Sequence, residues 1–260
     1  MNLGTARMIA LGVVGVVLSA KLTWSQQKPV GETNPARAAA GTSDADRERL
    51  QRLDSMKRAA AEYEVSLETP AKDKLKLQSE PALRWTNPVR GTTDGAVFIW
   101  LANGRPELAA GIYKWSSKPG EPDMEHELSS LAVGKMTVMR GGQTIWQPAK
   151  PGIELKPIPD AAVPAGTTAL RLVQLRSLAR EFTAFHDDPG ASEELRLLPQ
   201  PIYRHEKTGP ELLDGALFVF VQATDPEVLL LIEARRDEAG HRWQYGLARM
   251  TSRALRASHK

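Results

Sequence analysis

The amino-acid sequence predicts an α+β protein of two tandem related units, each a long helix packed on an antiparallel meander sheet. The stretch at residues 94–112 (DGAVFIWLANGRPELAAGI) returns at residues 214–232 (DGALFVFVQATDPEVLLLI), displaced by 120 residues without a gap. An amphipathic helix pattern precedes each copy. With 260 residues, 42% apolar composition and no cysteine, the chain must be stabilised by a hydrophobic core rather than by disulfide bonds.

The N-terminus predicts export. Arg7 precedes an apolar run of 13 residues, Met8 to Ala20, which is shorter than a bilayer-spanning helix. We therefore expect a signal peptide at residues 1–25 and a protein of the periplasm, cell envelope or extracellular space. The alternative is that this segment stays uncleaved as an N-terminal anchor. The protein would then be attached to a membrane through this segment alone. Residues 26–42 are rich in Pro, Ala and Gly and predict a flexible linker.

Residues 43–148 predict the first unit. Ser43 is placed to cap a helix through residues 45–65, since acids cluster at its start. Its apolar residues recur at three- and four-residue steps: Leu50, Leu53, Met56, Ala60 and Tyr63. Alternation and apolar runs predict strands near residues 75–77, 96–101, 107–115, 125–131 and 135–146. Asn103-Gly104 predicts a tight hairpin between two of them.

A connector and a second unit follow. Residues 149–166 contain four prolines, which disfavour both a helix and a central strand. Residues 167–260 predict a helix over residues 169–185 with a stripe of Leu175, Leu178, Phe182 and Phe185. Strands are expected near residues 194–198, 202–205, 216–222, 228–235 and 242–250.

The internal repeat extends beyond the hairpin. At an offset of 120, residues 75–112 have eleven identities in 38 positions, against roughly two or three expected by chance. The helices align at an offset of 122, with Tyr63 opposite Phe185. A duplicated unit with a cystatin-like or NTF2-like shape is the interpretation favoured, although amphipathic hairpins also look alike for general reasons.

Several kinds of chemistry have no signature in the sequence. A net charge of +3 without a dense basic stripe does not indicate nucleic-acid binding. The five histidines have no metal-ligand spacing, and nucleophile-elbow, P-loop and dinucleotide motifs are missing. No metal and no cofactor are therefore predicted. Asp94 and Asp214 precede glycine and are interpreted as turn residues, with a pair of carboxylates as the alternative.

The candidate ligand-binding residues lie on strands of the two units. Glu233 and Arg235 share one face of a strand, so a covered Glu233 needs a partner, with Arg249 or Arg204 as candidates. Aromatic residues on neighbouring strands suggest a polar–aromatic groove, the alternative being a core edge with a structural ion pair. The predicted ligand-binding residues are Tyr113, Trp115, Arg204, Glu233, Arg235, Trp243 and Tyr245.

Three segments carry a resemblance: ELRLLPQPIYR (Glu194–Arg204), DGALFVFVQATDPEVLLLIEARR (Asp214–Arg236) and WQYGLARMTS (Trp243–Ser252). Together they resemble uncharacterised secreted proteins of planctomycete-type bacteria. The resemblance implies export and supplies no catalytic residue.

These observations favour an exported binding or interaction module for an unknown protein or small ligand. A hydrolase or isomerase with a carboxylate/histidine site in a sheet cavity is the alternative. A structural envelope protein is a further one. The missing motifs weigh against the enzyme without excluding it.

Overall fold

The computed structural model describes residues 43–69, 74–87, 92–115, 124–206, 210–238 and 240–260. Residues 43–260 form one compact unit. The predicted signal peptide (1–25) and linker (26–42) lie outside the described residues. Neither described helix combines the length and the apolar character needed to cross a bilayer.

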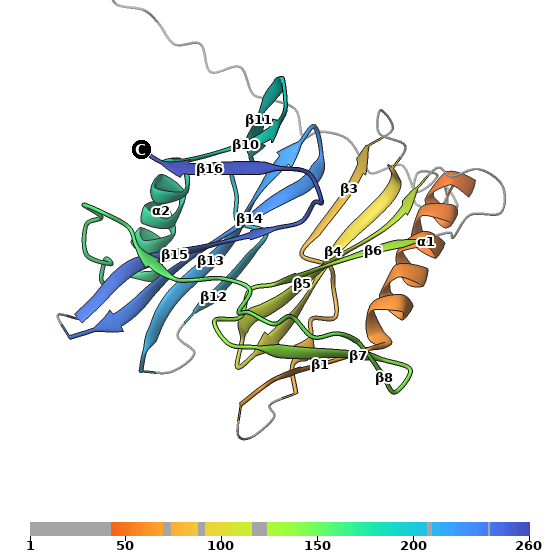
Figure 1. The fold of residues 1–260 in the computed structure, drawn as a ribbon, viewed down its shortest axis with the longest axis horizontal. Coiled ribbons are helices and arrows are strands. Elements are labelled where there is room, and N and C mark those ends of the chain that lie inside the picture. Colours follow the sequence, from red (N-terminus) through yellow and green to blue (C-terminus); the bar gives the residue numbers. More distant parts are fainter. Residues whose placement is uncertain (1–42, 70–73, 88–91, 116–123, 207–209, 239) are drawn as a thin grey trace, which may run out of the picture. The chain divides into compact units, whose positions relative to one another are not determined.

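The predicted α+β class, with a long helix packed on each sheet, is wrong. Of the described residues, 55% lie in strands and 15% in helices. Large, curled antiparallel sheets dominate the structure (Figure 1). The described part of the chain has two helices, α1 (Asp44–Ala61) and α2 (Thr168–Ala179).

The helices are shorter than predicted because the last part of each helix pattern is a strand. α2 ends at Ala179, and Phe182–Asp188 forms β10, where Phe182 and Ala184 are buried and Thr183 between them is half-buried. Likewise α1 ends at Ala61, and Tyr63–Leu67 forms β1. Pairing with neighbouring strands has outweighed the apparent helical spacing, as tertiary context commonly does for short aromatic and β-branched segments.

The helix starts agree with the sequence. The Ser43 hydroxyl accepts a hydrogen bond from the Asp46 amide at 3.1 Å and caps α1 as predicted. At α2 the Thr167 hydroxyl accepts one from the Leu170 amide at 3.3 Å. Thr167, rather than the adjacent Thr168, is therefore the cap residue of α2.

The first half of the unit (residues 43–148) contains eight of the strands in the described residues. The predicted Asn103-Gly104 hairpin is confirmed, with both residues at positive φ (49° and 87°) between β4 and β5. The strands are β1 (Tyr63–Leu67), β2 (Lys76–Leu77), β3 (Leu83–Asn87), β4 (Thr92–Ala102), β5 (Arg105–Trp115), β6 (Glu125–Ser130), β7 (Met136–Arg140) and β8 (Gln143–Trp146).

The second half (residues 167–260) follows the connector and has a helix and seven strands in its described residues, without a counterpart of β8. The connector's own strand, β9 (Lys156–Pro157), is two residues long and pairs with β15 at the edge of the sheet. The remaining strands are β10 (Phe182–Asp188), β11 (Ala191–Leu197), β12 (Tyr203–Glu206), β13 (Leu212–Gln222), β14 (Asp225–Asp237), β15 (Gly240–Arg249) and β16 (Leu255–His259).

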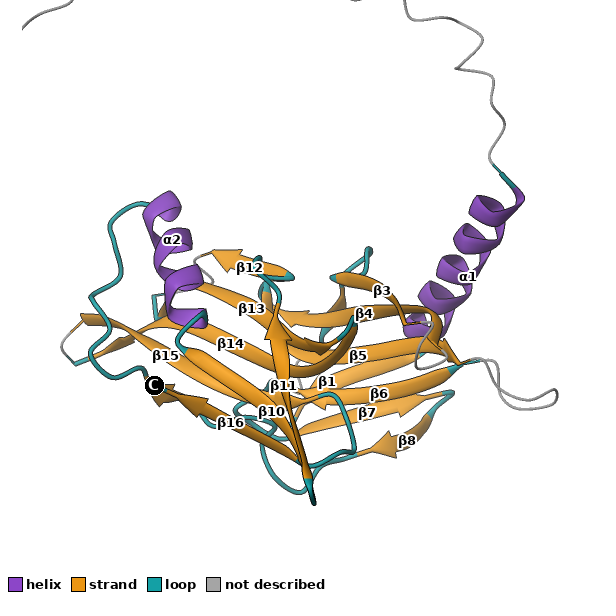
Figure 2. Cartoon of the chain, turned by 90° about the horizontal axis from the view of Figure 1, so that it is seen from above, coloured by secondary structure: helices purple, strands orange, loops and turns teal. Residues whose placement is uncertain are grey.

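The strands form three antiparallel sheets. One follows the order β2-β4-β5-β6 with β3 also on β4, and another β16-β10-β11-β13-β14-β15-β9 with β12 also on β13. The third is β1-β7-β8. Figure 2 shows α1 beside the sheets of the first half and α2 beside that of the second.

Strand pairing repeats between the halves. Leu83 faces Val97 on β3 and β4, and Tyr203 faces Leu217 on β12 and β13, at the same offset of 120. The irregularities of the β4–β5 pair return at the same offset in β13–β14. The buried helix faces instead correspond at an offset of 119, Met56 in α1 to Leu175 in α2, so the predicted helix offset of 122 is wrong.

Alternate residues of the long strands enter different cores, which explains their nearly continuous apolar sequences. On β4, Phe98 packs in a cluster with Met56 of α1, and Phe218 of β13 packs in another with Leu175 of α2. The side chains on the other face of these strands, from both halves, pack together in a third, central cluster. Its members include Val97, Ile99, Ala109, Leu131, Leu217, Val219, Leu229 and Leu231.

Candidate functional site

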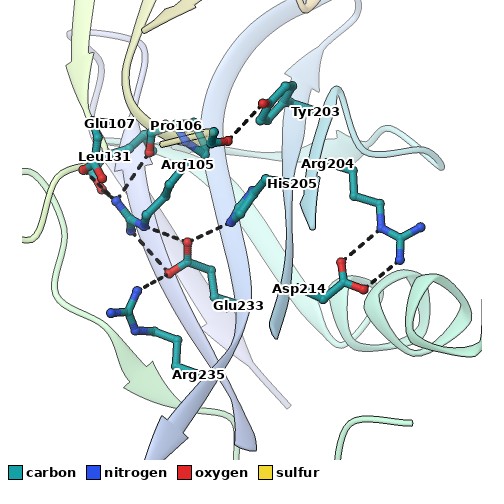
Figure 3. Close-up of polar contacts among 11 residues, drawn as sticks. Arg105, Pro106, Glu107, Leu131, Tyr203, Arg204, His205, Asp214, Glu233 and Arg235 are labelled. Atoms are coloured by element: carbon teal, nitrogen blue, oxygen red, sulfur yellow. Dashed lines mark hydrogen bonds and ion pairs between the residues drawn. The ribbon is translucent and has the colours of Figure 1, made fainter. Parts of the chain in front are cut away.

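Glu233 lies at the centre of a buried cluster that joins the two halves (Figure 3). Its Oε1 accepts a hydrogen bond from Nε of Arg105 at 2.8 Å, although Arg105 belongs to β5 of the first half. Nε2 of His205 lies 3.1 Å from the same oxygen, and Nη1 of Arg235 donates to Oε2 at 3.1 Å. Arg105, Glu107, His205, Glu233 and Arg235 are called the ion cluster below.

Charge is balanced within the ion cluster. Nη1 of Arg105 donates to Oε2 of Glu107 at 2.6 Å and to the Leu131 carbonyl at 3.3 Å. Two arginines therefore offset two glutamates. Burial alone would raise the pKa of Glu233, but the hydrogen bond from His205 and the charge of Arg105 lower it to about 2. A carboxylate held this firmly in its ionised form is poorly suited to general acid or base catalysis at neutral pH.

Glycine makes room for the histidine of the ion cluster. Gly215 pairs with Glu233 across β13 and β14, and a Cβ at Gly215 would lie 2.4 Å from Nε2 of His205. At the corresponding place in the first half, a Cβ on Gly95 would lie 2.5 Å from the Trp85 ring. The Asp-Gly pairs of the repeat thus have a packing role.

The predicted partners of Glu233 are wrong. Arg204 instead binds Asp214, and Arg249 donates to the carbonyls of Thr251 and Arg253. The actual partner from the other half, Arg105, was not identified from the sequence. The repeat carries the one signal that could have drawn attention to Arg105. The residue at offset 120 from it is Asp225, so the repeat places charged residues of opposite sign at these two equivalent positions.

Asp94 and Asp214 are not the turn residues that their Asp-Gly sequences suggest. Both lie inside strands and are buried. Asp214 accepts hydrogen bonds from Nε of Arg171 at 2.7 Å and from Nη2 of Arg204 at 2.8 Å. Asp94 accepts one from Nη2 of Arg84 at 2.7 Å and one from Nε of Arg52 at 3.3 Å. Each aspartate therefore fastens a helix to a sheet.

The predicted aromatic residues do not converge on one groove. Tyr113 packs against Trp85 and donates hydrogen bonds to Glu125 and Glu127. Trp243 is buried in the cluster beside α2, against which Tyr245 also packs. Trp115 ends β5, and its side chain lies outside the described residues.

Trp243 lines a cavity of about 410 Å³ that we call the helix pocket. Ser177, Leu178 and Glu181 contribute from the α2 side, Asp160 from the connector, and His259 from β16. Nε2 of His259 lies 3.2 Å from Oε2 of Glu181. None of the ion-cluster residues lines the helix pocket.

Among the described residues, no group of three or more histidine and acidic side chains is arranged to hold a metal ion. Comparison with known proteins finds no matching family model, no matching curated protein and no matching solved structure. The resemblance to uncharacterised secreted bacterial proteins stays a prediction.

Proposed function

We propose that the protein is an exported binding module that takes a small amphipathic ligand in the helix pocket. The observation that carries this proposal is a cavity of about 410 Å³ with Trp243 and Leu178 in its wall and charged groups at Glu181 and His259. Small-molecule sites generally have volumes of about 300–1,000 Å³ and combine apolar walls with a few polar groups.

The corresponding place in the first half supports this choice. A cavity of about 290 Å³ lies there beside α1, lined by Met56 and Met124 among others. Met124 corresponds to Trp243 at an offset of 119. An indole ring offers a larger rigid contact surface than a thioether chain. Of the two cavities beside the helices, the one next to α2 is therefore the larger and has the side chain better suited to recognise a ligand.

The hydrolase or isomerase alternative rests on the His259–Glu181 pair at the helix pocket. The first half weakens this alternative, because Arg140 and Glu62 occupy the corresponding positions and form an ion pair at 2.6 Å. An arginine does not exchange protons at neutral pH. Both pairs connect the end of a helix to the strand beside it, which is a structural role.

We further propose that the two halves derive from a duplicated segment and that the chain is exported through residues 1–25. Repeated strand registers and repeated irregularities support the first proposal. The apolar run at Met8 to Ala20 supports the second. N-terminal sequencing of the product in a bacterial host tests export, and an intact cytoplasmic chain would contradict it.

Binding can be tested with the neutral fluorescent probe 6-propionyl-2-dimethylaminonaphthalene. Its emission should rise and shift to shorter wavelength on the wild-type protein. Ser177→Trp should fill the helix pocket and weaken binding at least tenfold. Leu170→Trp, on the same helix at a side chain that is 57% exposed, is the matched control and should bind as the wild type does. Equal affinities for both variants would refute the assignment of the site.

A further inference from the structure

Another cavity, of about 320 Å³, lies where the two halves meet. Arg49 of α1 and Arg84 of β3 line it from the first half, and Arg196 of β11 from the second. Leu83, Trp85 and Leu198 contribute apolar surface, and no carboxylate of a described residue lines it. We call this cavity the arginine pocket.

The positive charge of the arginine pocket is only partly compensated. Arg84 binds Asp94 through Nη2 alone, and its Nε is buried without a hydrogen-bond partner. Nη2 of Arg196 donates to the Ala223 carbonyl at 2.9 Å, a neutral acceptor. Within the described residues, Arg49 forms no ion pair. Of these three guanidinium groups, only that of Arg84 is paired with a carboxylate among the described residues, and Asp94 also binds Arg52.

The equivalent position in the second half shows how a larger side chain could occupy the arginine pocket. At offset 120 from Leu83 stands Tyr203, whose hydroxyl reaches the first half and donates to the Gly104 carbonyl at 3.0 Å. Arg204, the counterpart of Arg84, uses both Nε and Nη2 on Asp214, whereas Arg84 uses Nη2 alone on Asp94. Both arginines also donate to a helix carbonyl, Arg204 to Thr168 at 2.7 Å and Arg84 to Arg49 at 3.5 Å. In the second copy Tyr203 thus bridges the two halves, whereas Leu83 in the first copy has no hydroxyl and is too short to do so.

We propose that the arginine pocket is a binding site for a small organic anion, a carboxylate or phosphate group on an apolar body. Guanidinium groups present paired donors that match the oxygens of such anions. Leu83, Leu198 and Trp85 supply the surface for the apolar part. This site is separate from the helix pocket, so either proposal can fail without the other.

Titration calorimetry on the mature chain tests the proposal with four probes: 4-phenylbutyrate, phenyl phosphate, inorganic phosphate and uncharged 4-phenylbutyramide. We expect binding of one or both organic anions, weaker binding of inorganic phosphate and none of the amide. Affinity should fall as salt rises, because the attraction is between charges. Absence of binding by both organic anions at millimolar concentration, or equal binding of the amide, overturns the proposal.

Variants locate the site. Arg49→Ala and Arg196→Ala remove exposed side chains and should each weaken binding about tenfold, the usual size of a charge-assisted contact. Leu83→Tyr should block the pocket as Tyr203 does in the other half, with the melting temperature retained. Arg58→Ala, an exposed arginine of α1 paired with Asp54, is the control and should bind normally. Loss of binding in Ser177→Trp but not in Leu83→Tyr would place the anion in the helix pocket and overturn the assignment.

Discussion

The ion cluster and its counterpart in the first half share their backbone positions and differ in their chemistry. Asp225 stands where Arg105 does, at an offset of 120, and it too reaches the other half, accepting hydrogen bonds from Trp85 at 2.6 Å and Asn87 at 3.0 Å. Tyr113 stands in the place of Glu233. The comparison shows that strand register constrains which positions contact the other half. The charge of the side chain at such a position differs between the two copies.

The second difference concerns the carboxylates. In the ion cluster, basic groups hold Glu233 ionised. Around Tyr113 the nearby charges are largely acidic, and burial together with Glu227, Glu125 and Asp225 raises the pKa of Glu127 to about 7. Two related places in one chain therefore respond to pH in opposite directions.

The largest effect is expected from Arg105→Met, which leaves Glu107 and Glu233 buried without their main cation. Breaking a buried ion pair from one side costs about 3–5 kcal/mol, and urea denaturation should show a loss of this size in the free energy of unfolding. Glu233→Met added to this variant should recover part of the loss. Arg58→Met breaks an exposed pair and should cost about 1 kcal/mol or less. Similar losses for Arg105→Met and Arg58→Met would mean that the ion cluster does not hold the halves together.

A smaller but unequal effect is expected from the two aspartates. Asp214→Ala strands Arg171, whose side chain is 8% exposed, and should cost about 3 kcal/mol. Asp94→Ala strands Arg52 and Arg84, which are 29% and 21% exposed, so water can replace part of the lost contacts. Its loss should be lower by about 1 kcal/mol. Thermal unfolding of both variants measures which one loses more stability. A larger loss of stability for Asp94→Ala than for Asp214→Ala would contradict the prediction.

The stability of the protein should depend on pH in two windows. The pKa of Glu233 is depressed to about 2, so its contribution is present above the unfolded value of about 4.3 and is lost as the pH falls toward 2. The pKa of Glu127 is raised to about 7, so its contribution is present below about 4.3 and is lost as the pH rises through 7.

Glu127→Gln isolates the second window. It should remove the decline in unfolding free energy between about pH 4.3 and 7, while Glu125→Gln, at a more exposed position on the same strand, should retain it. Urea denaturation at pH 5 and pH 8 provides the comparison. An unchanged decline in Glu127→Gln would show that Glu127 is not its source.

The smallest effect is expected from Tyr203→Phe, which removes only the hydrogen bond to the Gly104 carbonyl. The loss should be about 0.5–1.5 kcal/mol. Leu83→Phe, at the corresponding position, breaks no hydrogen bond and serves as the control. A loss for Tyr203→Phe no greater than that for Leu83→Phe would mean that the tyrosine contributes only by filling space.

The sequence was informative where the physics is local. The Ser43 cap and the Asn103-Gly104 turn depend on neighbours along the chain, and both are found as predicted. The sequence overestimates the length of α2 because Phe182 continues a helical spacing, while its pairing partner, His259, lies 77 residues away. Alternation over so few residues cannot distinguish the two structures.

The candidate site was less predictable because its contacts cross between the halves. The strand pattern indicates that Glu233 needs a partner if its face is covered, and Glu233 is buried. The partner Arg105 lies 128 residues away, and no periodicity connects the two. The sequence predicts a groove that contains both Trp243 and Tyr113. The strands instead send them into different clusters, beside α2 and against Trp85. The repeat identifies equivalent backbone positions in the two halves. It does not say which face of each strand packs against a helix and which packs in the central cluster.

The central cluster has a consequence for assembly. Val97 and Ile99 of one half pack with Leu217 and Val219 of the other, so either half alone would expose a broad apolar sheet face. The proline-rich connector keeps the halves at high effective concentration and favours closure within one chain. Two fragments severed in that connector should reconstitute the fold when mixed, and at high protein concentration intact chains should exchange halves to give domain-swapped dimers.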